Sequence, residues 1–85
     1  MTNKDKPINQ YSLQSLEAWL QNLGAEKDND DPSKWRLDHA DWQAIIYFEQ
    51  EDLSVLWDFN GQHIKRSFSY CINKEDVQNA ILQGP

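Results

Sequence analysis

The chain has 85 residues, a formal net charge of −6 and a single cysteine, Cys71. A chain of this length forms one small domain, and its core must be rich in large side chains because so short a chain buries only roughly 60% of its unfolded surface. Four Trp, three Tyr and three Phe supply them. One cysteine excludes an internal disulfide, and the excess of 14 acidic over 8 basic residues argues against nucleic-acid or anionic-membrane binding through a basic surface.

The hydropathy pattern also limits where the protein can reside. No apolar run approaches the ~20 residues that span a bilayer, and the first ten residues, MTNKDKPINQ, lack the apolar segment of a signal peptide. The sequence therefore predicts a soluble, cytoplasmic protein without membrane insertion.

The first predicted helix follows a polar start. Residues 1–10 are expected to form a flexible arm, and residues 11–85 a single domain. Ser12 can cap the helix and Gly24 can end it. Between them leucines recur at the spacing of one helical face, at Leu13, Leu16, Leu20 and Leu23. Residues 25–34 form a hydrophilic connection.

Four strands are predicted next, at 34–38, 42–49, 53–59 and 62–70. Asn60-Gly61 is a strong signal for a type I′ hairpin turn, because both residues tolerate positive φ. Four-residue connections at 38–41 and 49–52 would set Leu37 opposite Trp42 and Phe48 opposite Leu53. Strand side chains alternate, so one face collects most of the large apolar residues. These are Trp35, Leu37, Trp42, Ala44, Ile46, Phe48, Leu53, Val55, Trp57, Phe59, Ile64 and Phe68.

A short second helix completes the pattern. Asn73 can cap it, Gly84-Pro85 ends it, and Val77, Ala80 and Ile81 form its apolar stripe. The predicted fold is therefore α+β in the order α-β-β-β-β-α, a four-stranded antiparallel meander with both helices packed on one face.

Several short segments suggest a family. They are LEAWL at 16–20, LGA at 23–25, Asp31-Pro32 with Trp35, Trp42, RSFSY at 66–70, Asp76-Val77 and Gly84-Pro85. In this order and spacing they resemble a small cyanobacterial and plastid family of domains of unknown function, over about residues 9–85. The resemblance implies a phototrophic source and an intracellular location, and it implies no activity. A His-Pro pair common before the first helix in that family is replaced here by Tyr11-Ser12.

The residues that could carry chemistry are few and poorly placed for it. The register sets His63 opposite Asp58 on a solvated face, which is typical of a surface pair. Cys71 has no base beside it and is expected to be a buried packing residue. The acidic loop at 28–31 lacks the glycine and late glutamate of a calcium-binding loop. We expect no enzyme activity, no cofactor and no metal.

The opposite sheet face supplies the functional hypothesis. Ile45 falls directly opposite Leu56, with Tyr47 two residues away, and contiguous exposed apolar surface usually marks an interaction site. Lys65 and Arg66 form the one compact basic spot. The predicted partner-binding residues are Ile45, Tyr47, Leu56, Lys65 and Arg66.

The sequence thus predicts a protein-binding module, an assembly or regulatory factor in a phototroph. Its partner is an unidentified protein or a second copy of the chain. The alternative is RNA binding, by analogy with the topology of the double-stranded-RNA-binding domain. The acidic start of the second helix, where Glu75 and Asp76 follow Lys74, disfavours it.

Arg66 is the exception in the pattern, because the register places it on the apolar face opposite Val55. An unpaired guanidinium is too costly to bury. We expect Arg66 to reach over the sheet edge and pair with a carboxylate at the start of the second helix.

Overall fold

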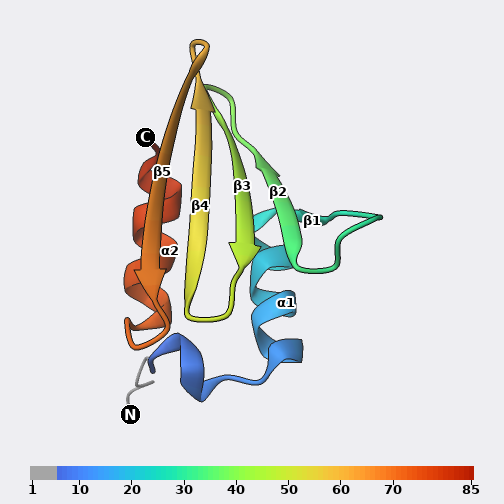
Figure 1. Cartoon of the computed structure of the whole chain (residues 1–85), viewed down its shortest axis with the longest axis vertical. Coiled ribbons are helices and arrows are strands. Elements are labelled where there is room, and N and C mark those ends of the chain that lie inside the picture. The colour runs from blue at the N-terminus through green and yellow to red at the C-terminus, as the bar shows by residue number, and fades with distance from the viewer. Residues whose placement is uncertain (1–5) are drawn as a thin grey trace.

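The computed structural model describes residues 6–85 of the chain. Its elements are η1 (Ile8–Gln10), α1 (Leu13–Leu23), β1 (Glu26–Lys27), β2 (Lys34–Asp38), β3 (Gln43–Phe48), β4 (Asp52–Phe59), β5 (Gln62–Ser69) and α2 (Lys74–Gln83). The five described strands form one antiparallel sheet in the order β1-β2-β3-β4-β5 (Figure 1). The predicted α+β class is confirmed.

The prediction of four strands is wrong, because β1 adds a fifth within the expected hydrophilic connection. Its two residues pair as Glu26 with Arg36 and Lys27 with Trp35. A two-residue strand is too short to show alternation in the sequence. Side chains hold it in place instead: Lys27 Nζ lies 3.0 Å from a Glu17 carboxylate oxygen on α1.

The predicted register is confirmed in two hairpins and shifted in the third. Phe48 pairs with Leu53, and Trp57 pairs with Ile64. Leu37, however, pairs with Ala44 rather than with Trp42, because the loop spans 39–42 and not 38–41. Within this loop the His39 N–H donates to the Trp42 carbonyl at 2.8 Å, and the two rings stack at 4.4 Å. The shift is by two residues, so every side chain keeps its predicted face.

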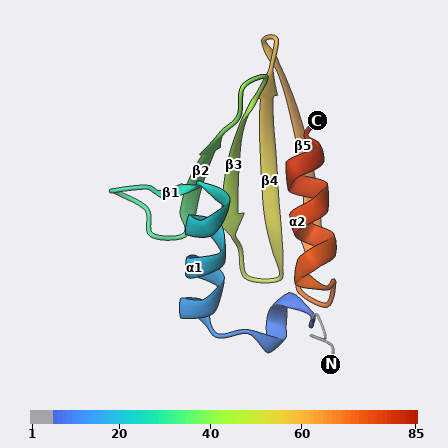
Figure 2. The same ribbon diagram turned by 180° about the vertical axis from the view of Figure 1, so that it is seen from behind.

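The core lies between the sheet and the helices. Figures 1 and 2 show α1 and α2 on the same face of the sheet, α1 behind β2 and α2 beside β5. Two indoles attach α2: the Trp19 Nε1–H donates to Gln78 Oε1 at 2.8 Å, and the Trp57 Nε1–H donates to the Ile81 carbonyl at 3.4 Å. The fully buried large side chains include Ile8, Leu20, Trp35, Ile46, Leu53, Val55, Trp57, Val77 and Ile81.

The described part of the N-terminal segment packs against the domain. Ile8 is 1% exposed, and its N–H donates to the Ile72 carbonyl at 3.0 Å. The Asn9 N–H donates to the Tyr70 carbonyl at 2.9 Å. The flexible arm predicted over 1–10 therefore does not extend through Ile8 and Asn9, whereas residues 1–5 lie outside the described part. A single isoleucine among polar residues gives no periodic signal, which is why the sequence did not indicate this docking.

We expect the Asn60-Gly61 turn to fix the last hairpin. Asn60 has φ 52° and Gly61 has φ 77°, and a Cβ on Gly61 would meet no atom within 4 Å. Gly61→Val should therefore cost about 1–3 kcal/mol through backbone strain alone, since a β-branched residue is strained at positive φ. Thermal and urea denaturation measure this cost. A stability equal to that of the wild type would contradict the turn assignment.

Substitution of Gly84 should disturb the structure for a different reason, a steric clash. A Cβ on Gly84, at φ 89°, would lie 2.5 Å from Trp42 Nε1. Gly84→Ala should therefore displace the end of the chain from Trp42 and shift the indole N–H resonance of that residue in an NMR spectrum. Gly61→Ala is the matched control, because it adds the same methyl at positive φ in open space. Equal effects of the two substitutions on the Trp42 resonance would show that this contact is unimportant.

Candidate functional site: the outer face of the sheet

The outer face of the sheet is the side away from the helices, and it faces the viewer in Figure 1. Its central row crosses all five strands through successive cross-strand neighbours, Glu26, Arg36, Ile45, Leu56 and Lys65. The predicted pairing of Ile45 with Leu56 is present at the middle of this row. Both side chains are half-buried, between exposed Arg36 on one side and exposed Lys65 on the other. The centre of the outer face is thus an apolar pair bounded by two cations.

The rows on either side of this pair differ in charge. One neighbouring row runs Lys34, Tyr47, Ser54 and Ser67. The other runs Asp38, Gln43, Asp58 and His63. The outer face therefore has a basic and aromatic end and an acidic end, with the apolar pair between them.

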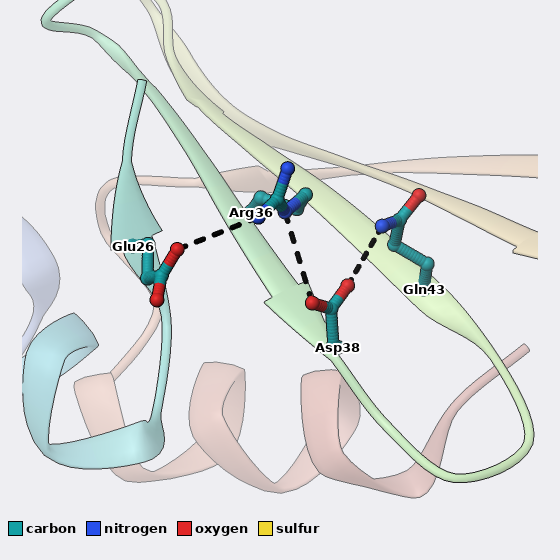
Figure 3. Close-up of polar contacts among 4 residues, drawn as sticks. All are labelled: Glu26, Arg36, Asp38 and Gln43. Carbon is teal, nitrogen blue, oxygen red and sulfur yellow. Dashed lines mark hydrogen bonds and ion pairs between the residues drawn. The ribbon is translucent and has the colours of Figure 1, made fainter. Parts of the chain in front are cut away.

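A polar network borders the apolar pair on the β1 side (Figure 3). Arg36 Nη2 lies 3.4 Å from Glu26 Oε1, and Arg36 Nε lies 3.8 Å from Asp38 Oδ2. The Gln43 amide donates to Asp38 Oδ1 at 2.7 Å. Both contacts of Arg36 are long for a charge-assisted hydrogen bond, so the guanidinium is held loosely.

A hollow of about 390 Å³ lies over this network. Its lining is mostly charged and polar, with Ile45 as the apolar residue at its border: Glu26, Lys27, Asp28, Asn29, Lys34, Arg36, Gln43 and Ile45. Alternation in the sequence does not predict this hollow, because one of its walls is the two-residue strand β1. Arg36 could have been recognised, since it alternates with Trp35 and Leu37 and must face the same side as Ile45.

Glu49 lies in the loop between β3 and β4, beyond the outer-face row that contains Tyr47 and Ser54. Its carboxylate accepts a hydrogen bond from the Ser54 hydroxyl at 2.8 Å, which explains how Ser54 can be 1% exposed on this face. Its backbone carbonyl accepts a hydrogen bond from the Tyr70 hydroxyl. The loop is thereby tied to the end of β5.

The five predicted partner-binding residues do not share one face. Ile45, Tyr47, Leu56 and Lys65 lie on the outer face, with Lys65 directly beside Leu56. Arg66 lies opposite Val55 on the inner face, as its register predicts. It is exposed, and its Cζ lies 5.0 Å from the Phe68 ring centroid. The guanidinium of Arg66 thus lies over the Phe68 ring in a cation–π contact on an exposed edge strand; pairing with a carboxylate at the start of α2 stays a prediction.

The other two candidates for chemistry are the His63–Asp58 pair, whose predicted exposure is observed, and Cys71, whose predicted burial is not. His63 Nε2 lies 3.7 Å from Asp58 Oδ2, and both side chains are more than half exposed, as expected of a surface pair. The expectation that Cys71 is buried is wrong, because Cys71 is exposed. It lies in the turn after β5, where its N–H donates to the Ser69 hydroxyl at 3.1 Å and its Sγ accepts a hydrogen bond from the Asn9 side-chain amide at 3.8 Å.

The acidic loop between β1 and β2 uses its carboxylates to cap its own turns. Asp28 accepts hydrogen bonds from the backbone N–H groups of Asp30 and Asp31, each at 2.9 Å. Asp31 accepts from the hydroxyl and the N–H of Ser33, and these bonds lower the pKa of its carboxyl. Among residues 6–85 there is no group of three or more His, Cys, Asp or Glu side chains that could hold a metal ion.

Comparison with known proteins gives a family without an assigned activity. The model of a family described as "Protein of unknown function (DUF3143)" matches residues 23–84. The chain belongs to this family. The matched segment contains all five described strands and α2, and therefore the whole outer face. No curated protein and no solved structure matches the chain.

Membership confirms the resemblance to a small family of domains of unknown function. It adds no substrate, ligand or partner. No helix in the described part of the chain combines the length and apolarity needed to cross a bilayer.

The Tyr70 hydroxyl should make stability sensitive to alkaline pH. Burial raises the pKa of Tyr70 above its ordinary value of 10.0, and the carboxylates of Asp52 and Glu49 raise it further. A group whose pKa is raised on folding contributes stability that is complete below its unfolded pKa and is lost as the pH rises through its folded pKa. We therefore expect wild-type stability in urea to fall above about pH 10, and Tyr70→Phe to show a shallower fall. Parallel losses in the two proteins would contradict this coupling.

Proposed function

We propose that the chain is a small, non-catalytic protein-binding module, an assembly or regulatory factor that acts through the outer face of its sheet. The observation that carries the proposal is the Ile45–Leu56 pair at the centre of a face that neither α1 nor α2 covers. Apolar side chains paired across neighbouring strands form a continuous patch rather than scattered surface residues.

The surroundings of the pair define the kind of partner that fits. Arg36 and Lys65 flank it within the same row, and Lys34 Nζ lies 6.0 Å from the Tyr47 ring centroid nearby. The complementary surface would present an apolar side chain to Ile45 and Leu56 and carboxylates to these cations. The hollow beside Ile45 has room for a partner side chain, which would compete for the loosely held Arg36.

The cellular setting rests on the resemblance described above. The resemblance implies a phototrophic source and an intracellular location, and the setting we propose is therefore the cytoplasm of a phototrophic cell. RNA binding remains the alternative, and a second copy of the chain remains the alternative protein partner.

Paired substitutions on two different surfaces test the proposal. Leu56→Lys puts a charge at the centre of the outer face, and Leu13→Lys makes the same change at an α1 side chain that is 61% exposed. Both variants should fold, because substitutions at partly exposed positions usually change stability by about 0.5 kcal/mol or little more. In affinity purification from the native cell, we expect Leu13→Lys to retain the wild-type partner and Leu56→Lys to lose it at least about tenfold, or roughly 1.4 kcal/mol.

Three results would contradict the proposal. One is equal capture by the two variants, which would place binding elsewhere. Another is unfolding of Leu56→Lys in circular dichroism, which would show that Leu56 is core. The third is wild-type binding to RNA that weakens steeply with salt, since phosphate contacts release counterions.

A further inference from the structure

We propose that the open edge of β5 binds an extended acidic segment of another protein, which adds to the sheet as a sixth strand. This site is separate from the apolar pair of the outer face. It is formed by the backbone of β5 together with the charges of Lys65 and Arg66.

The position of β5 provides the first argument. It is the last strand in the sheet order and pairs only with β4, over eight residues that span about 27 Å at ~3.4 Å per residue. Every β5 side chain except Phe68 is exposed. The tip of the β4–β5 hairpin extends beyond the C-terminal end of α2 (Figures 1 and 2), so α2 does not accompany β5 along its whole length. Long open edges of this kind are templates for strand addition.

The hairpin geometry determines which backbone groups of β5 are open. A two-residue turn makes its flanking residues, Phe59 and Gln62, a hydrogen-bonded pair, and such pairs then alternate along the ladder. The N–H and C=O groups of the intervening residues His63, Lys65, Ser67 and Ser69 therefore point away from β4. The structure agrees at Ser69, whose carbonyl accepts a hydrogen bond from the Ile72 N–H at 3.0 Å.

The remaining outward groups have no backbone partner in the described part of the chain. Within residues 6–85, no backbone hydrogen bond outside the β4–β5 ladder reaches His63, Lys65 or Ser67. Their N–H and C=O groups form an open row with the two-residue repeat that an added strand requires.

The charges on β5 favour an acidic strand from another protein over a second copy of β5. The strand carries Lys65 on the outer face and Arg66 on the inner face, and it contains no Asp or Glu, although the whole chain has a net charge of −6. Antiparallel pairing of two β5 edges would bring these cations together across the new ladder, and like charges directly opposite one another are destabilising. An acidic strand from a different protein meets both cations favourably, one on each face.

The inner face adds an apolar contact for such a strand. Ile64, which is 37% exposed, pairs with Trp57, whose indole bonds to the Ile81 carbonyl of α2. Ile64 is therefore one of the exposed large apolar side chains among residues 6–85, and it lies on the edge strand itself. A strand with an acidic residue on each face and an apolar residue beside Ile64 fits these contacts.

A model peptide and a backbone substitution test the inference. The probe is an acetylated and amidated octapeptide, Val-Glu-Glu-Val-Val-Glu-Glu-Val, whose consecutive glutamates point to opposite faces of a strand. It is titrated into the intact protein and followed by NMR. We expect the amide N–H groups of His63, Lys65 and Ser67 to gain protection from hydrogen exchange on binding. A peptide with lysine in place of glutamate should bind at least about tenfold more weakly.

Ser67→Pro removes one outward N–H and leaves both cations in place, and proline is tolerated where an edge N–H faces solvent. Ser67→Ala is its matched control. We expect the proline variant to lose binding and the alanine variant to retain it. If the proline variant does not fold, Lys65→Glu combined with Arg66→Glu must reverse the preference between the two peptides.

Four outcomes would overturn the inference. They are absence of peptide binding at millimolar concentration, binding without protection of the three amides, equal binding by the proline and alanine variants, and self-association through β5 in place of peptide binding. A peptide that perturbs Ile45 and Leu56 instead would overturn the edge site while supporting the outer-face proposal, so the two can fail independently.

Discussion

The pairing of β3 with β4 determines both surfaces of this domain at once. On the inner face it sets Ile46 beside Val55, both fully buried beneath the helices. On the outer face it sets Ile45 beside Leu56. Because side chains alternate, a shift of one residue would exchange the two faces, exposing the core and burying the charged row. Stability and the proposed binding surface therefore depend on the same register.

Tryptophan side chains connect this sheet to the helices. Trp19 and Trp57 each bury a large apolar ring and use their indole N–H to hold a group on α2. Trp42 is covered by His39 on one side and by Gly84 near the chain end. Trp19 and Trp57 thus supply both apolar area and a directional bond, which suits a small domain without a disulfide. The inner face is committed to stability, which leaves the outer face and the β5 edge for recognition.

Alternation and turn chemistry made most of this arrangement predictable. The hairpin at Asn60-Gly61, the side to which each central strand residue points, and the edge position of Arg66 all follow from local sequence. Features that form together with tertiary contacts do not follow from local sequence. Trp42 stacks on His39 within the shifted loop. The short strand β1 pairs with β2 and contacts α1 through Lys27 and Glu17, and Ile8 is buried beside residues near the other end of the chain. The hollow beside Ile45 was missed together with β1, since β1 is one of its walls.

The docking of the N-terminal segment has a consequence for the order of folding. Lys6, Ile8 and Asn9 make backbone hydrogen bonds to Lys74, Ile72 and Tyr70. Closing so long a loop carries an entropic cost that local hairpin contacts do not. During synthesis the first of these segments emerges from the ribosome long before the second. The β3–β4 and β4–β5 hairpins can form from neighbouring residues in the interval, whereas the site for Ile8 is completed only when Ile72 is present. During synthesis, the backbone hydrogen bonds of the N-terminal segment can therefore be completed only after residues 70–74 have emerged.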